Sequence, residues 1–184
     1  IQSHLSTHFA LRASLAIVLY DLQEMKEIGK DEVGVTYFAC DYSEGVLSNL
    51  PWEDEQFDCL FFPALPVDEP AYTSAIEEIL KKNIDWVFTC EPDSERWHDV
   101  VDKMAVVLGC QQEIGDGSPM TAWFDEVKKI EDWDAAYNHG GSDYFLFVFI
   151  SAEDSLESRV ERLRSRLKAD QDGRINSVPL RSTS

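Results

Sequence analysis

The stretch IDWVFTCEPDSERWHDVVDKMAVVLG, residues Ile84 to Gly109, decides the fold of this chain. It opens with an apolar run that ends at Cys90, and after a proline the apolar residues return at helical spacing. Asp93 or Ser94 is a natural residue to begin that helix, and Gly109 to end it. A buried strand that leads directly into an amphipathic helix is half of a strand–helix–strand unit. In sheets built from such units, ligands bind beyond the carboxyl ends of the strands.

Other segments extend this pattern in both directions. Three more runs have the composition of buried strands: residues 33–40 (VGVTYFAC), 57–63 (FDCLFFP) and 144–150 (YFLFVFI). Helices are predicted in four further segments: residues 9–28, residues 71–82, a segment that begins at Ser118-Pro119 and continues towards Tyr137, and residues 153–167. Apolar strands separated by helices indicate a mostly parallel sheet with helices on both faces. We therefore expect an α/β fold, a three-layer Rossmann-like sandwich with about four to five strands.

The length and composition favour one folded unit. The chain has 184 residues, of which 44% are hydrophobic, enough for a single sizeable core. We expect residues 1–169 to form a single α/β domain and residues 170–184 to be a disordered tail.

The charge is strongly negative and unevenly distributed. The formal net charge is -19, and residues 1–150 carry nine Lys or Arg against 29 Asp or Glu. Such a surface repels nucleic acids and anionic membranes, so neither is expected as a partner. It attracts cations or a basic protein, and the acidic loop residues Glu53, Asp54 and Glu55 are the predicted partner-binding positions. Simple solubility explains the same charge equally well.

The four cysteines form no C-x-x-C pair and have no zinc-ligand spacing. Three of them lie in or at the ends of predicted buried strands, where a free cysteine acts as a small apolar residue. No apolar run approaches the roughly 18 residues that a membrane span requires. This pattern favours a reducing, cytoplasmic environment.

Carboxylates follow two of the predicted strands. Asp41 comes after the first, and Glu91 and Asp93 come after the third. If these strands are parallel neighbours, the three carboxylates meet at one edge and supply the oxygen ligands that Mg²⁺ prefers. The simpler interpretation is that Asp93 caps the following helix and that the other two are solvated.

A second group of candidates has the residue types of catalytic sites. His98 lies in the first turn of the helix after the third strand, close in sequence to Glu91. It is a candidate general base, and with Cys90 it is a candidate nucleophile pair. A surface histidine beside a structural cysteine is the more common arrangement.

The segment GDGSPMTAW, residues 115–123, combines a glycine-containing loop with a predicted helix start. The backbone N–H groups of Asp116, Gly117 and Ser118 are candidates for anion binding at that start. The glycine spacing is that of neither a dinucleotide fingerprint nor a P-loop. The simpler interpretation is a well-capped helix with Met120 and Trp123 packed inward.

Two motifs occur together in this chain. They are W-V-x-x-C-x-P-x-x-x-x-x-H-D, from Trp86 to Asp99, and G-D-G-x-P-M-T-A-W, from Gly115 to Trp123. Over roughly residues 35–150 the chain resembles a family of small bacterial α/β domains of unknown function. The resemblance implies the fold and a bacterial cytoplasmic origin, and no mechanism.

The predicted C-terminal helix carries an apolar stripe: Leu156, Val160, Leu163 and Leu167. A stripe of this length usually packs on the helix's own sheet, and a homodimer through this helix is the alternative.

Two hypotheses of function follow. The first is a non-catalytic binding protein of the immunity or inhibitor kind, whose acidic surface engages a basic protein. The second is a small metal-dependent or nucleotide-binding enzyme with its site at the carboxyl ends of the strands. We favour the first, because the charge asymmetry is present in the sequence whereas the site is inferred.

Overall fold

The computed structural model describes residues 25–43, 45–52, 55–63, 69–90, 93–109, 119–124, 142–150 and 152–172. In chain order the elements of these ranges are β1 (Lys26–Lys30), β2 (Thr36–Asp41), the 3-10 helix η1 (Val46–Asn49), β3 (Phe57–Pro63), α2 (Glu69–Leu80), β4 (Ile84–Cys90), α3 (Ser94–Leu108), β5 (Met120–Phe124), β6 (Tyr144–Ile150) and α4 (Leu156–Gln171). No helix in these ranges is long and apolar enough to cross a lipid bilayer.

The six strands form one mostly parallel sheet with the order β1-β2-β6-β3-β4-β5. Only β1 runs antiparallel to its neighbour, and every other pairing is parallel. The last strand in the sequence, β6, therefore lies in the centre, between β2 and β3. The seven residues YFLFVFI suit this position, because a central strand of a parallel sheet is covered on both faces.

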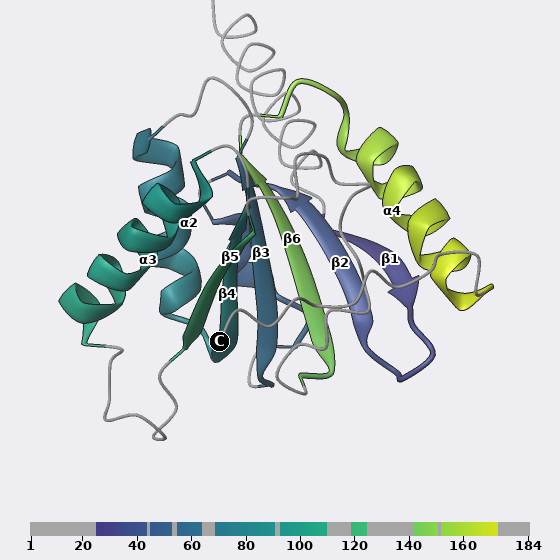
Figure 1. Cartoon of the computed structure of the whole chain (residues 1–184), viewed down its shortest axis with the longest axis horizontal. Coiled ribbons are helices and arrows are strands. Elements are labelled where there is room, and N and C mark those ends of the chain that lie inside the picture. The colour runs from purple at the N-terminus through teal and green to yellow at the C-terminus, as the bar shows by residue number, and fades with distance from the viewer. Residues whose placement is uncertain are drawn as a thin grey trace, which may run out of the picture.

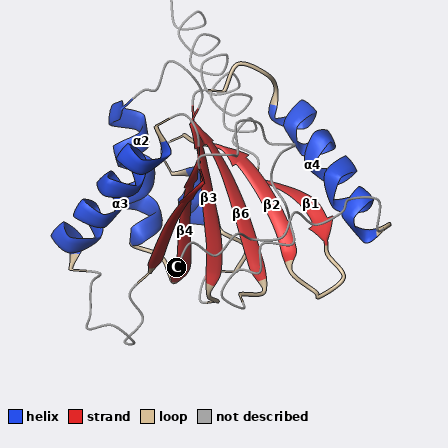
Figure 2. Cartoon of the chain, viewed as in Figure 1, coloured by secondary structure: helices blue, strands red, loops and turns tan. Residues whose placement is uncertain are grey.

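Alternate residues of β2, β3, β4 and β6 contribute to two separate cores, one on each face of the sheet drawn in Figure 1. Leu146 and Val148 of β6 belong to the core shared with η1, α2 and α3, whereas Phe145 and Phe147 belong to the core under α4. Helices accordingly cover both faces, with α2 and α3 on one and α4 on the other, near β1 (Figure 2). The chain is an α/β protein, as the apolar strands and the helical spacing between them predict.

The two predictions for the helix α3 have different outcomes. Gly109 ends the helix in the left-handed conformation, with φ 69°, as expected of a C-terminal glycine. Asp93 does precede the helix, but it also adopts a positive φ of 60° and makes no capping hydrogen bond with its side chain. The main-chain carbonyl of Asp93 instead accepts the first helical hydrogen bond, from Trp97 at 3.0 Å.

The apolar stripe of α4 packs on the chain's own sheet. Val160 is fully buried, and Leu163 and Leu167 are 4% and 8% exposed. All three belong to the same core as Phe147. These side chains are therefore not available to a second copy, and the homodimer through this helix stays a prediction. The helix extends to Gln171, two residues beyond the predicted domain boundary, and residues 173–184 lie outside the described ranges.

Two strands occupy segments that the sequence pattern assigns to helices. β1 overlaps the end of the helix predicted over residues 9–28. Met25 and Ile28 fit helical spacing, but pairing with β2 prevails over that local pattern. β5 begins directly after Pro119, where a helix start is predicted. A proline is as well suited to the entry of an edge strand, and pairing with β4 decides the outcome. Residues 9–24 and 125–137 of these predicted helices lie outside the described ranges.

The central position of β6 predicts that truncating one of its side chains lowers the free energy of unfolding. Phe147 is 2% exposed and its ring lies 4.9 Å from that of Phe145. We expect Phe147→Ala to lower the free energy of unfolding by about 3–5 kcal/mol, because it leaves a cavity in the core. Urea denaturation measures this change. Val33→Ala, at a side chain that is 85% exposed, is the control and should change the same quantity by less than about 0.5 kcal/mol. Equal losses for both variants would contradict the central placement of β6.

Candidate functional site

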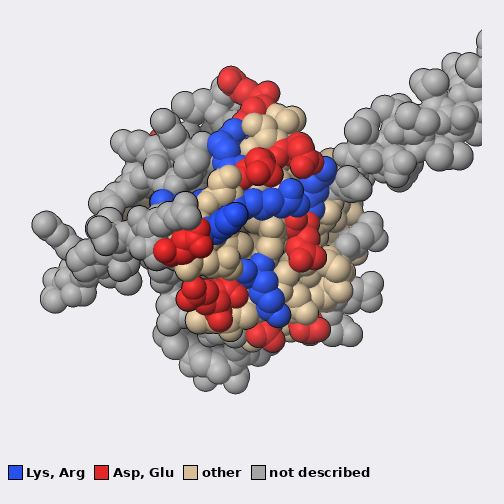
Figure 3. Space-filling model, turned by 90° about the vertical axis from the view of Figure 1, so that its right-hand side faces the viewer, with Lys and Arg blue, Asp and Glu red and all other residues tan. Residues whose placement is uncertain are grey.

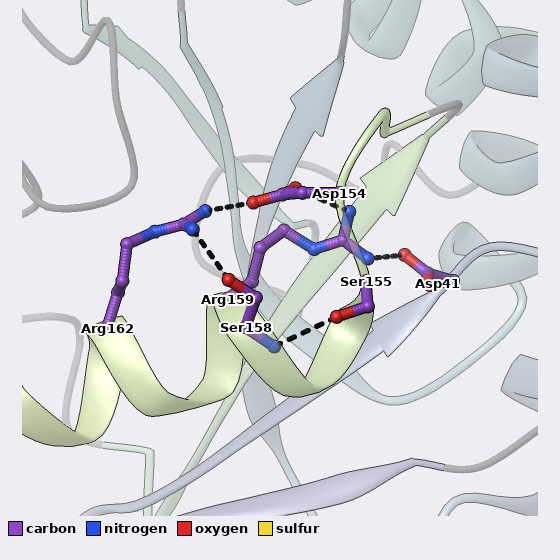
Figure 4. Close-up of polar contacts among 6 residues, drawn as sticks. All are labelled: Asp41, Asp154, Ser155, Ser158, Arg159 and Arg162. Carbon is purple, nitrogen blue, oxygen red and sulfur yellow. Dashed lines mark hydrogen bonds and ion pairs between the residues drawn. The ribbon is translucent and has the colours of Figure 1, made fainter.

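A buried arginine lies at the carboxyl end of β2. The Arg159 side chain is 3% exposed and donates hydrogen bonds to Asp41, at the end of β2, and to Asp154, at 3.3 Å. Its guanidinium also lies 4.4 Å from the ring centre of Phe149. Arg162 donates to the other oxygen of Asp154 at 2.6 Å (Figure 4). Two guanidinium groups therefore face two carboxylates and fasten α4 to the sheet.

Burial is the largest single influence on the pKa values of Asp41, Asp154 and Arg159. Burial raises the pKa of Asp41, although the charge of Arg159 lowers it. Burial lowers the pKa of Arg159, and Asp41 and Asp154 counteract this effect. Burial also raises the pKa of Asp154, but the hydrogen bond and charge of Arg162, together with Arg159, outweigh it and leave that pKa below its usual value.

The cluster occupies the point in the sheet where ligands usually bind. The chain leaves the end of β2 towards η1, on the α2 and α3 face, whereas it leaves the neighbouring β6 towards α4, on the other face. Such a topological switch point is the usual ligand crevice of an open α/β sheet. Here the Arg159 guanidinium lies at that point and is held by protein carboxylates.

The predicted metal site of Asp41, Glu91 and Asp93 does not assemble as expected. Two strands, β6 and β3, separate β2 from β4, so Asp41 and Asp93 follow strands about 14 Å apart. Asp41 is paired with Arg159, and Asp93 lies 3.9 Å from Arg96. Glu91 lies outside the described ranges. Among the residues that the structure describes, no group of three His, Cys, Asp or Glu side chains has an arrangement that holds a metal ion.

The structure does not bring Cys90 and His98 together as a pair, because the two lie on different faces of the sheet. Cys90 belongs to the core under α4 and its Sγ donates to the Phe61 carbonyl at 3.3 Å. His98 lies on α3, on the opposite face, with its Nδ1 3.7 Å from Asp102 and its ring 4.6 Å from that of Trp123. Both side chains have structural contacts that account for their positions.

All three cysteines of the described ranges are unsuited to nucleophilic chemistry. Cys40, Cys59 and Cys90 are free thiols and fully buried. Burial raises the pKa values of Cys40 and Cys59, which keeps both in the unreactive thiol form.

The predicted anion-binding residues Asp116, Gly117 and Ser118 lie outside the described ranges, so that prediction has no structural counterpart here. The prediction that Met120 and Trp123 pack inward from a helix is wrong, because the residues that follow form the strand β5. As parts of β5, these side chains are 51% and 43% exposed. Trp123 shields one side of His98, and Thr121 donates to Asp102 at 2.8 Å.

The acidic loop is described only in part. Glu53 and Asp54 lie outside the described ranges, whereas Glu55 is exposed and its charge raises the pKa of Tyr144, at the start of β6. Glu55 thus lies at the amino-terminal ends of the parallel strands, whereas Asp41 lies at their carboxyl ends.

The same end of the sheet holds a buried carboxyl group that was not predicted from the sequence. Asp58 of β3 is 1% exposed and accepts hydrogen bonds from Ser142 Oγ, at 2.9 Å, and from the Trp86 backbone. Burial, together with the charge of Asp85, raises its pKa to about 6, although both hydrogen bonds lower it. A lone acid within the apolar run FDCLFFP was the available signal.

Protein-family models, curated proteins and solved structures were each compared with the chain, and none of them matches it. The resemblance of its two motifs to a bacterial domain family therefore stays a prediction. The geometry defines an α/β protein whose predicted reactive residues, where described, have structural partners.

The Arg159 cluster yields a prediction about stability. Asp41→Asn removes one of the two carboxylates that compensate a buried guanidinium, and we expect it to cost about 1–2 kcal/mol because Asp41 itself is half exposed. The double variant Asp41→Asn with Arg159→Met should be more stable than Asp41→Asn alone, because methionine requires no countercharge. Urea denaturation of the four proteins of the cycle measures the coupling. Additive losses would show that the pair carries no coupling energy.

Asp58 yields a prediction about pH. Its pKa is raised from 3.8 to about 6 in the folded protein, so the folded state binds this proton more tightly than the unfolded chain. Ionisation of Asp58 therefore lowers stability as the pH rises from about 4 to about 6. Asp58→Asn retains the acceptor and cannot ionise. We expect it to exceed the wild type in stability at pH 7 by on the order of 2 kcal/mol, and by much less at pH 4. Parallel stability curves between these pH values, measured by thermal or urea denaturation, would refute the assignment.

Proposed function

We propose that this chain is a non-catalytic binding protein whose acidic surface engages a basic protein partner, as an immunity or inhibitor protein engages a basic toxin. The uneven charge of the chain is the observation that carries the proposal. β1 and α4 together hold seven Lys or Arg and four Asp or Glu, whereas the rest of the chain holds nine and 31.

On the side of the molecule that carries α4, acidic side chains form ion pairs with neighbouring Lys and Arg side chains. Figure 3 shows basic and acidic side chains interleaved over this side. Glu157 pairs with Lys26 and lies 3.8 Å from Arg164, and Arg162 pairs with Asp154. A basic partner gains little from these acids, because Glu157 and Asp154 already have cations beside them. The uncompensated negative charge belongs to the other segments, where it speeds association and selects for partners of opposite charge.

The structural roles of the reactive residues favour binding over catalysis. Asp41 is engaged by Arg159, Cys90 is buried, and His98 packs against Trp123. A small metal-dependent or nucleotide-binding enzyme is the alternative, and it requires such groups to meet at a crevice. The described ranges bring none of these three together, so that alternative gains no support from them.

We also infer the finer class of the fold. Five parallel strands with helices on both faces support a Rossmann-like three-layer sandwich, with β1 as an added antiparallel edge. Free, buried cysteines support a reducing location such as the cytoplasm.

A pull-down from a bacterial lysate tests the proposed function. With the chain as bait we expect one stoichiometric basic protein to be retained at about 0.1 M salt and weakened at about 0.5 M, because salt screens exposed charges. The triple variant Glu53→Lys, Asp54→Lys and Glu55→Lys should lose this partner.

The matched control carries the same change of charge on the side that carries α4: Glu32→Lys, Glu153→Lys and Glu161→Lys. We expect this control to retain the partner. Equal loss in both triple variants would show that net charge alone matters, and no capture by the unmodified chain would count against the proposed function.

A further inference from the structure

Asp58, near the start of β3, is a buried acid that is 1% exposed. Among the described residues, no Lys, Arg or His forms an ion pair with it. The groups that act on its carboxyl are Ser142, just before β6, and Asp85 and the Trp86 backbone of β4. Its own strand contributes the thiol of Cys59, which burial keeps protonated. A buried carboxylate in such surroundings lacks the countercharge that usually offsets its loss of hydration.

The pairing of β3 with β4 is irregular at this residue. Phe57 lies opposite Ile84, whereas Asp58 lies opposite Trp86, so Asp85 has no counterpart in β3. An extra residue of this kind disrupts the strand ladder locally and redirects side chains. Here it leaves an acid of β4 beside the buried acid of β3, and their charges repel each other.

A side-chain hydrogen bond through the same carboxyl joins the starts of β3 and β6. Ser142, itself 8% exposed, donates from its Oγ to Asp58 at 2.9 Å. The hydrogen bonds from Ser142 and Trp86 favour the ionised carboxyl, whereas burial and the charge of Asp85 disfavour it. Burial is the largest of these effects. The carboxyl that links the two strands is therefore more stable there with its proton than without it.

We propose that Asp58 is a pH-sensitive switch of local opening at the amino-terminal ends of β3 and β6 (the amino end). When protonated, Asp58 keeps the amino end closed through Ser142. When ionised, it favours opening, because an open amino end hydrates the carboxylate and separates it from Asp85. The closed form retains the proton to a higher pH than the open form does. Opening is therefore rarest below about pH 4 and increases until about pH 6.

The amino end also carries one of the proposed partner-binding positions. Glu55 lies three residues before Asp58, and its charge acts on Tyr144 at the start of β6. Under the proposed function, opening of the amino end changes how this acidic segment is held, so the pH regulates the binding surface. This consequence rests on the proposed function, whereas the switch itself does not.

Hydrogen–deuterium exchange of the whole chain, corrected at each pH for the intrinsic exchange rate, tests the switch. At about pH 7 we expect residues 57–59 and 144–145 to have amide protection factors at least about tenfold lower than those of Phe147 and Val148, because the amino end opens without global unfolding. The protection factors of the amino end should also fall by about tenfold or more between about pH 4.5 and about pH 7. Equal protection of the two groups of amides would show that only global unfolding occurs and would overturn the inference.

Two variants with the same change of residue assign the response to Asp58. Asp58→Asn cannot ionise, so we expect its protection factors at the amino end to change by less than about twofold over this pH range. Asp143→Asn is the matched control, because Asp143 is an exposed acid beside Ser142. This control should retain the full response of the unmodified chain. A response in Asp58→Asn equal to that of the control would assign the effect to other acids and refute the switch.

Two further variants retain Asp58 and carry the test where Asp58→Asn does not fold, which circular dichroism checks. Asp85→Asn removes the repulsion, so the pH at which the response levels off should move down. Ser142→Ala removes a hydrogen bond to the ionised form, so that pH should move up. An unchanged pH in both variants, or a shift in the same direction, would overturn the inference.

These measurements are independent of the lysate experiment. If the unmodified chain captures no basic protein but shows the exchange response, the proposed function fails and the switch stands. If it captures the salt-sensitive protein but shows no response that depends on Asp58, the switch is wrong and the proposed function stands.

Discussion

The burial of β6 on both faces is the constraint on which the rest of the structure depends. From Phe145 to Ile150 every side chain is at most 2% exposed, with alternate residues in two cores. Such a strand is stable only with neighbours on both sides and helices on both faces. β2 and β3 supply the neighbours, η1, α2 and α3 cover one face, and α4 contributes to the other.

The elements that could be predicted from the sequence are those with a strong local signal. The four apolar strands and the helices α2, α3 and α4 have clear periodicity, and all are present. β1 and β5 could not be predicted, because neither MTAWF nor KEIGK alternates cleanly between apolar and polar residues. Each is a strand because pairing with a neighbouring strand prevails over the local pattern that suggested a helix.

The candidate site depended on an order of strands that the sequence does not contain. Asp41 and Asp93 follow strands separated by β6 and β3, and nothing near either residue signals that the last strand inserts between them. Arg159 was missed for a related reason. In α4 it lies beside Leu156 and Val160, on the apolar side, but a basic residue on a charged helix reads as solvated. Only the carboxylates of Asp41 and Asp154 account for its burial.

The net charge decides between two kinds of association. Molecules that each carry a net charge of -19 repel one another as they approach, which opposes self-association. At β1 a second device acts, because Arg164 and Gln171 of α4 donate hydrogen bonds to main-chain carbonyls of that edge strand. Repulsion between copies does not obstruct a basic chain, which the same field attracts. The charge therefore selects partners of opposite sign over a second copy.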